Sequence, residues 1–206
     1  MGEGSALIVN GFTIPEDTIN YTGADDAARF GHRLPYYTQR VREEAEQLRP
    51  WLVPVMSCLD IGCGLGLIDA LIAKITGANH VHMMDGQGAI DNRVMGYNDG
   101  TKAWADVRVG RRLVAANTDA DVTAHVADPT VTIPVDLIVS FKSWGHHYNI
   151  DEYLPLALRS LKPGGRVIVD LRNGKGGREV LEQNGFKVVG SFIASPKCVR
   201  TILERT

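Results

Sequence analysis

The stretch that decides the fold is residues 59–67, which reads LDIGCGLGL. A short apolar run ending in Asp60 precedes the glycines, as expected of a buried strand. Apolar residues then recur with helical spacing from Leu65 to Thr76. Glycine lets the chain turn sharply and lets a ligand approach the backbone, and the N–H groups that begin a helix attract a polar or anionic group. The stretch therefore predicts a nucleotide-like cofactor at the carboxyl edge of a sheet.

The sequence on either side of these glycines alternates between strand and helix patterns. Strands are predicted at residues 53–60, 80–85, 122–126, 135–141 and 166–171, and helices at residues 35–49, 65–76, 102–116, 151–161 and 178–184. Two last runs, at residues 186–193 and 198–203, predict a terminal hairpin. The alternation predicts an α/β fold in which helices cover both faces of a parallel sheet. Residues 1–35 show no such pattern, so we expect them to be irregular.

The composition is that of a soluble globular chain of 206 residues with a net charge of -2. This balance argues against disorder and provides no overall basic field for a nucleic acid. No apolar run approaches the ~20 residues needed to span a bilayer, and the N-terminus lacks the basic region of a secretion signal. Three cysteines, Cys58, Cys63 and Cys198, indicate reduced thiols in a cytoplasmic protein. We expect no membrane partner, and the sequence leaves the oligomeric state open.

A second acid, Asp85, ends the strand that follows the glycine loop. A carboxylate in this place can accept hydrogen bonds from two ribose hydroxyls. The dinucleotide fingerprint G-x-G-x-x-G/A requires a small third residue, and here that position is Leu67. The loop and Asp85 therefore predict a nucleoside cofactor that is not a dinucleotide.

The pattern D-x-G-x-G-x-G, from Asp60 to Gly66, resembles motif I of the class I S-adenosylmethionine-dependent methyltransferases. The resemblance runs from about residue 50 to the end and includes Ala127-Asp128 and the LKPGG turn at residues 161–165. It implies a doubly wound, seven-stranded, mostly parallel Rossmann-like sheet with a C-terminal antiparallel hairpin, and S-adenosyl-L-methionine as the cofactor. On this basis residues 1–50 are an N-terminal extension or lid and residues 51–206 are the methyltransferase domain.

The resemblance also implies roles for individual residues. Asp60 orients the amino group of the methionine moiety, Asp85 binds the ribose, and Asp128 contacts the adenine amino group. The alternative for Asp128-Pro129 is a plain turn. The predicted cofactor-binding residues are Asp60, Gly62, Cys63, Gly64, Gly66, Asp85, Gly86, Asp128 and Ser140.

The segment after the fourth strand of the core, residues 140–148, reads SFKSWGHHY and is expected to face the ligand crevice. Methyl transfer needs an aligned nucleophile and sometimes a base to take its proton. Histidine is best tuned for that at neutral pH, so His146 and His147 are the candidate catalytic residues. The alternative is that they pack against the following helix.

The same segment indicates the class of acceptor. It lacks the proline-containing motif with which base amino methyltransferases hold a flipped base, so we expect no nucleic-acid partner. It resembles the HH loop of small-molecule methyltransferases and is similar to that of sugar O-methyltransferases. The resemblance implies a small-molecule methyl acceptor, most simply a hydroxyl group. The alternatives are a nucleic-acid or protein methyltransferase and a non-catalytic cofactor-binding module.

Two other clusters are expected to be structural. His80 and His82 share one face of a strand but have no carboxylate at a metal-ligand spacing, so we expect no metal. Arg108, Arg111 and Arg112 gather on one predicted helix, where a solvated face is the default interpretation and phosphate binding the alternative.

Overall fold

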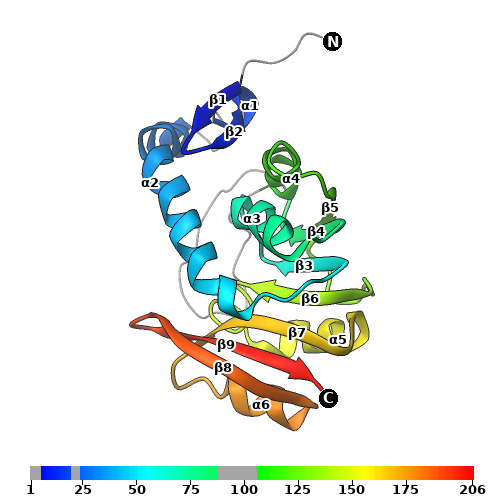
Figure 1. The fold of residues 1–206 in the computed structure, drawn as a ribbon. Helices are drawn as coiled ribbons and strands as arrows, with labels where there is room; N and C mark the ends of the chain where they lie inside the picture. The colour runs from blue at the N-terminus through cyan, green and yellow to red at the C-terminus, as the bar shows by residue number, and fades with distance from the viewer. Residues whose placement is uncertain (1–5, 20–23, 88–105) are drawn as a thin grey trace.

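The computed structural model describes residues 6–19, 24–87 and 106–206, without the side chains of residues 19 and 24–33. Its centre is a seven-stranded sheet in the order β5-β4-β3-β6-β7-β9-β8, in which only β9 runs antiparallel to its neighbours (Figure 1). The strands are β3 Ser57–Ile61, β4 His80–Asp85, β5 Asp121–Val126, β6 Val135–Ser140, β7 Leu161–Arg172, β8 Phe186–Ser195 and β9 Cys198–Arg205. The predicted doubly wound, mostly parallel sheet with a closing antiparallel hairpin is confirmed.

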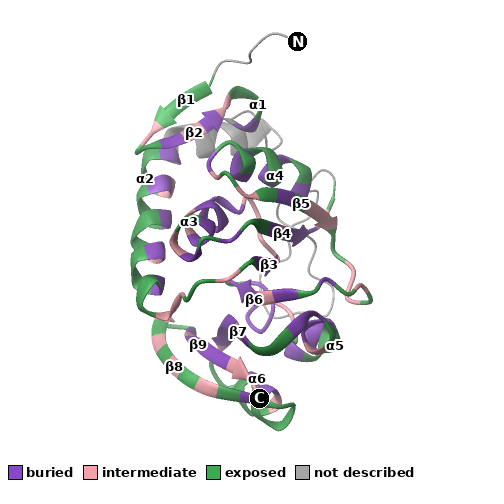
Figure 2. Ribbon diagram, turned by 45° about the vertical axis from the view of Figure 1, so that its right-hand side comes forward, coloured by how far each residue is buried: buried purple, intermediate pink, exposed green. Residues whose placement is uncertain are grey.

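Helices cover both faces of the sheet because successive strand residues point to opposite sides. Cys58 packs in one apolar cluster with residues of α2, α3 and α4, whereas the next residue, Leu59, packs in a second cluster with residues of α5 and α6. The helices are α2 Ala24–Leu48, α3 Leu67–Thr76, α4 Val107–Ala115, α5 Ile150–Ser160 and α6 Gly177–Gln183. Figure 2 shows the central strands largely buried and α2 buried along one side only. No helix among the described residues is long and apolar enough to cross a membrane.

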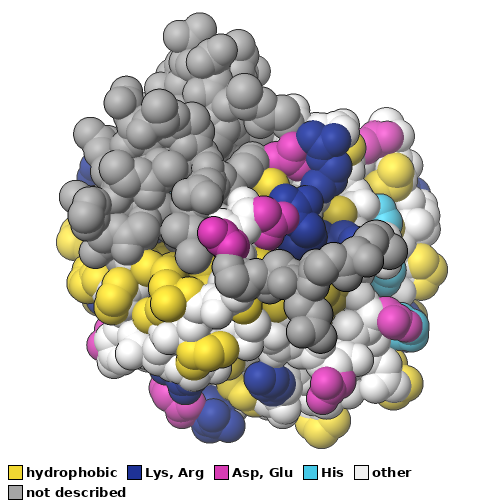
Figure 3. All heavy atoms as spheres, turned by 90° about the horizontal axis from the view of Figure 1, so that it is seen from above, with side chains coloured by type: hydrophobic (Ala, Val, Ile, Leu, Met, Phe, Trp, Pro, Cys, Tyr) yellow, Lys and Arg dark blue, Asp and Glu magenta, His cyan; other side chains and the backbone are white. Residues whose placement is uncertain are grey.

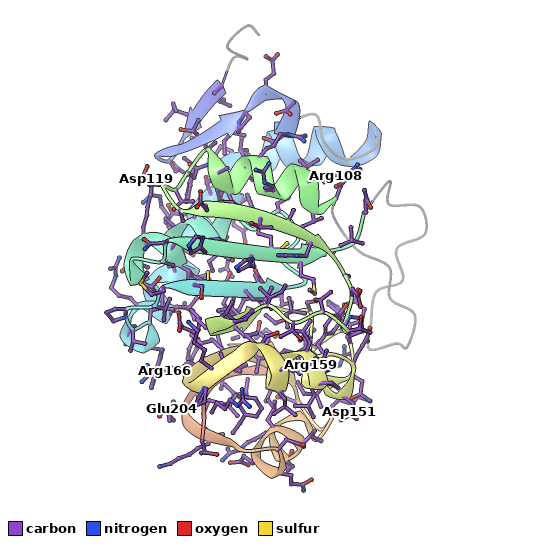
Figure 4. The ribbon with its side chains drawn as sticks, turned by 90° about the vertical axis from the view of Figure 1, so that its right-hand side faces the viewer. Arg108, Asp119, Asp151, Arg159, Arg166 and Glu204 are labelled. Atoms are coloured by element: carbon purple, nitrogen blue, oxygen red, sulfur yellow. The ribbon has the colours of Figure 1, made fainter. Side chains whose placement is uncertain are left out.

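Parallel pairing places the ends of β3, β4 and β6 at one edge of the sheet. Ile61 pairs with Met84, and Asp60 pairs with Val139 on the other side. Figure 4 shows Arg108 and Asp151, which follow β4 and β6 in the chain, at this carboxyl edge, and Asp119, Arg166 and Glu204 at the opposite edge. The loops that carry the predicted cofactor and acceptor residues therefore meet along one side of the molecule.

The expectation that residues 1–35 are irregular is wrong for the part that the structure describes. A hairpin of β1 Ala6–Val9 and β2 Phe12–Pro15 precedes α1 Glu16–Ile19. Helix α2 begins at Ala24, so Pro35 lies inside it and not before it. An internal proline removes one helical hydrogen bond, while the Pro35 carbonyl accepts a hydrogen bond from Asn10 Nδ2 at 2.9 Å. The division of the chain at residue 50 stays a prediction.

Two smaller differences concern the ends of elements. The LKPGG stretch was expected to precede a strand, but Leu161 already pairs with Val135, and pairing resumes at Arg166 after a register shift. The predicted helix at residues 102–116 is described only from Val107, since residues 102–105 lie outside the described residues. A short 3-10 helix, η1 Arg49–Trp51, follows α2 and leads the chain toward the sheet.

Trp51 holds this end of α2 against the sheet. A Cβ atom added at Gly190 of β8 would lie 2.3–2.9 Å from three carbons of the Trp51 ring, so the indole lies directly on the backbone of β8. We expect Gly190→Ala to lower the free energy of unfolding by about 1–3 kcal/mol, as overpacking does. In a Trp51→Ala background the same substitution should cost much less, because its clash is gone. Urea denaturation measures both effects, with Ser191→Ala on the same strand as the control; equal costs in the two backgrounds would rule out this contact.

Candidate functional site

The loop between β3 and α3 has a backbone that only glycine adopts easily. Gly62, Gly64 and Gly66 have φ angles of 75°, 57° and 64°, in the left-handed region. A Cβ atom at Gly62 would lie 1.7 Å from Ser143 Oγ, and one at Gly66 would lie 2.3 Å from Met83 Cε. The loop therefore packs too closely against its neighbours to carry side chains at these two positions.

Asp85 lies beside the tip of this loop. Its Oδ2 accepts a hydrogen bond from Gly64 N at 2.6 Å, and its Oδ1 accepts one from Gly86 N at 2.7 Å. Burial raises the pKa of the Asp85 carboxyl, and the N–H groups of Gly86 and Gly64 oppose this rise. The structure thus brings together three of the predicted cofactor-binding residues.

Asp60 forms a buried acidic pair with a residue that the sequence analysis missed, Asp69 of α3. Asp60 is 3% exposed and Asp69 is 1% exposed. Asp60 Oδ1 and both carboxylate oxygens of Asp69 have no hydrogen-bond partner among the described residues. Burial raises the pKa of Asp60, as does the charge of Asp69, and burial raises the pKa of Asp69 to about 7. The sequence feature that could have identified Asp69 is an acidic residue on the otherwise apolar face of the predicted helix.

Tyr37 of α2 reaches the same place, since its hydroxyl interacts with Leu67 of α3. Burial raises the pKa of Tyr37, and the charge of Asp69 raises it further. Cys63, another predicted cofactor residue, is half-buried in the loop, where its thiol lies 3.6 Å from Gly64 O. Helix α2 therefore contributes a side chain to the surroundings of the glycine loop.

The β6–α5 loop is fixed from within. Ser140 Oγ donates to Ile61 O at 2.7 Å and accepts from Trp144 N at 2.9 Å, which joins the end of β3 to the loop. Trp144 is fully buried, and its Nε1 donates to Ile150 O at 2.6 Å. The Ser140 hydroxyl thus holds the loop in place, and a cofactor contact by Ser140 stays a prediction.

His146 and His147 lie side by side in this loop, with ring centroids 4.7 Å apart and ring planes at 75°. His146 is 7% exposed, and its Nδ1 has no hydrogen-bond partner among the described residues. Burial lowers the pKa of His146 to about 4, and the neighbouring His147 ring contributes in the same direction. His146 is therefore a neutral imidazole at pH 7 with one buried ring nitrogen that has no hydrogen-bond partner among the described residues.

Asp128 lies in a turn after β5. Its Oδ1 accepts hydrogen bonds from Thr130 N at 2.8 Å and from Thr130 Oγ1 at 2.7 Å. The Thr130 hydroxyl and N–H lower the pKa of Asp128, so the carboxylate is charged near neutral pH. The plain-turn geometry is present, and the adenine contact stays a prediction.

The arginines of α4 are engaged within the protein. Arg108 pairs with Asp106, Arg112 Nε lies 2.7 Å from Asp17 Oδ2, and Arg111 Nε donates to Val122 O at 2.8 Å. On the face seen in Figure 3, Lys and Arg side chains lie directly beside Asp and Glu side chains. This cluster thus offers no patch of a single sign for phosphate. In the described parts of the chain, no group of three or more His, Cys, Asp or Glu side chains is placed to hold a metal.

A buried arginine connects α2 to the β6–α5 loop through an ion network that was not predicted from the sequence. Arg200 of β9 is 1% exposed; its Nε lies 2.7 Å from Asp170 Oδ1 and its Nη2 lies 2.6 Å from Glu44 Oε1. Its guanidinium carbon lies 4.2 Å from the centroid of the Phe141 ring. Asp170 Oδ2 also accepts a hydrogen bond from Lys142 N at 3.2 Å. The network therefore fixes the first residues after β6.

A methyltransferase-domain family matches residues 30–187, which is more than half of the chain. The chain belongs to this methyltransferase family. The predicted enzyme class and the predicted S-adenosylmethionine cofactor are thereby confirmed. No curated protein matches the sequence.

Solved structures share the fold of this methyltransferase at low sequence identity. A SAM-dependent methyltransferase from Aquifex aeolicus is 18% identical, with a TM-score of 0.56 over 79% of this chain and 89% of that chain. A methyltransferase from Pyrococcus furiosus is 20% identical, with a TM-score of 0.54 over 80% of this chain and 82% of that chain. A ribosomal protein L11 methylase from Lactobacillus delbrueckii subsp. bulgaricus is 18% identical, with a TM-score of 0.54 over 84% of this chain and 79% of that chain.

The residues of the methyltransferase fit this cofactor. Its amino-acid part carries an ammonium group, and the orphaned Oδ1 of Asp60 is a buried acceptor beside the glycine loop. Nothing lies within 4 Å of the place that a Cβ atom would take at Gly64, so the backbone at the tip of the loop is open to a ligand. Asp85 ends the neighbouring strand, where it would hold the ribose hydroxyls.

We expect Arg200→Met to lower the free energy of unfolding of the methyltransferase by about 3–5 kcal/mol, because it leaves the Asp170 carboxylate buried without its cation. Arg178→Met is the matched control, since Arg178 is exposed and its pair with Glu182 should contribute less than about 1 kcal/mol. Urea denaturation measures both variants. A cost for Arg200→Met as small as that of the control would mean that the network does not hold the loop.

Proposed function

We propose that this methyltransferase methylates a hydroxyl group of a small molecule held at the loop of residues 140–148. The observation that carries the proposal is the unpartnered Nδ1 of the buried, neutral His146. The loop lies next to the cofactor loop, since Ser143 Oγ occupies the space that a Cβ atom would take at Gly62. A hydroxyl bound to His146 would therefore be close to the transferred methyl group.

The chemistry assigned to the chain is orientation and proton removal. When bound, S-adenosylmethionine supplies a methyl group on a positively charged sulfur. His146 Nδ1 accepts a hydrogen bond from the acceptor hydroxyl and takes its proton as the new oxygen–carbon bond forms. A weak base is enough for this step, because a methylated oxygen that still holds its proton is a far stronger acid than an imidazolium. Lys142 and Arg172 add positive charge near the ring and help to keep it neutral.

The resemblance of the loop to sugar O-methyltransferases supports a sugar hydroxyl as the first acceptor to test. A nucleic-acid acceptor has less support, because the loop contains no proline and the described arginines of α4 have partners within the protein. The test is transfer of a labelled methyl group from S-adenosylmethionine to a panel of sugars, phenols, short RNAs and peptides. The proposal is supported if a sugar or phenol is labelled and the same compound with hydrogen in place of its hydroxyl group is not. Labelling of RNA or peptide alone contradicts the proposal.

With the acceptor found, we expect His146→Ala to lower kcat by about 10²–10⁴-fold at saturating cofactor, the usual contribution of a positioned base. His147→Ala, the neighbouring control, should have a smaller effect. Because the pKa of His146 is lowered to about 4, the ring stays neutral as the pH falls from 8 to 5. The kcat of the unmodified enzyme should therefore show no loss centred near pH 6.5. Full turnover by His146→Ala, with cofactor binding unchanged, would remove this role.

A further inference from the structure

We propose that Asp69 is a second carboxylate for the ammonium group of the cofactor, and that Asp60 and Asp69 share a proton that this ammonium displaces on binding. The inference concerns the cofactor and is independent of the acceptor proposed above. It goes beyond the role of Asp60 because it assigns a cofactor contact to a helix residue outside the glycine motif.

The first argument is the number of buried acceptors without donors. Asp60 Oδ1, Asp69 Oδ1 and Asp69 Oδ2 are all buried, and no donor on another described residue reaches them, so the only side-chain hydrogen-bonding group that acts on either carboxyl is the other carboxyl. An unpartnered buried carboxylate is costly, and a second one beside it adds like-charge repulsion. An ammonium group has three N–H donors and one positive charge. Its three donors match these three oxygens in number, and its charge is opposite in sign to that of the carboxylates.

The second argument is the position of Asp69. A Cβ atom added at Gly66 would lie 2.9 Å from Asp69 Oδ2, so the carboxylate touches the last glycine of the cofactor loop. The Asp69 N–H also donates to Gly66 O at 2.8 Å, which fixes the residue in the first turn of α3. Asp69 therefore lies where the glycine loop passes into the helix.

The third argument is the charge around the pair. The titratable side chains that act on the pair from the surrounding elements are Tyr37 and Glu44 of α2, Cys58 of β3, Cys63 of the loop and Asp85 of β4. None of these is a cation. One of the acids that act on Asp60, Glu44, is already compensated, because its carboxylate pairs with Arg200 at 2.6 Å. Among the described residues, no Lys or Arg ion-pairs with Asp60 or Asp69, so a bound ammonium would be their first counter-ion.

The shared proton gives cofactor binding a defined pH dependence. Burial raises the pKa of Asp69 to about 7, and burial together with the charge of Asp69 raises the pKa of Asp60. Below these pKa values the free protein holds a proton that the ammonium must displace, and above them the site is already ionised. The cofactor affinity should therefore rise with pH, with a limiting slope of about tenfold per pH unit on the acid side for one released proton.

Isothermal titration calorimetry of the full chain tests this directly. S-Adenosylhomocysteine is the main probe because it carries the same ammonium group and does not react. At pH 6, titrations in two buffers of different ionisation enthalpy should show release of about one proton. Asp69→Asn should lower the affinity for S-adenosylhomocysteine at least tenfold at pH 8 and abolish the proton release at pH 6. The matched control is Asp136→Asn, at the other edge of the sheet beside Lys162, which should change neither quantity.

A second ligand separates a contact from a structural role. 5′-Methylthioadenosine retains the adenine and ribose but lacks the amino-acid part, so Asp69→Asn should bind it as the unmodified protein does. Three results would overturn the inference. Asp69→Asn could weaken both ligands equally, or it could bind S-adenosylhomocysteine within twofold of the unmodified protein. The third is that the unmodified protein releases no proton on binding. Failure of the unmodified protein to bind either ligand would instead contradict the cofactor assignment itself.

Discussion

The constraint on which the site depends is the backbone at the end of β3, where three left-handed glycines follow a buried aspartate within seven residues. Neighbouring residues occupy the space that side chains would fill at two of these glycines. Ser143 of the β6–α5 loop packs at Gly62, Asp69 and Met83 pack at Gly66, and Asp85 accepts the N–H of Gly64. The β6–α5 loop, the start of α3 and the end of β4 are thus positioned against the glycine loop.

Two clusters of acidic side chains among the described residues differ in whether a cation compensates their charge. Asp170 and Glu44 share the guanidinium of Arg200, so this network is complete within the protein and links α2, β7 and β9. Asp60 and Asp69 have no such cation in the described part of the chain. A buried pair that lacks a counter-ion is expensive to keep unless a ligand supplies the charge. The difference separates an ion network that maintains structure from a carboxylate pair suited to binding.

Much of the fold was predictable from the sequence, because strand and helix periods alternate from residue 50 onward and motif I marks the first crossover. The N-terminal hairpin was not, since four-residue strands such as Phe12–Pro15 are too short to show a period. Asp85, Gly64 and Gly86 could be assigned to one site in advance, because parallel strands end at a common edge of the sheet. Asp69 and Arg200 could not be found, because a charged residue on a buried face becomes meaningful only when its partners from distant elements are known.

The two titrating parts of the site act in different pH ranges, and this separates their roles. Burial holds the pKa of His146 near 4, so this ring does not change charge between pH 5 and 8. Burial holds the pKa of Asp69 near 7, so the cofactor side changes charge within that range. A fall in activity on mild acidification at limiting cofactor would then reflect occupancy by the cofactor and not the loss of a base. We therefore expect the proposed ammonium subsite, and not His146, to give the enzyme its pH response near neutrality.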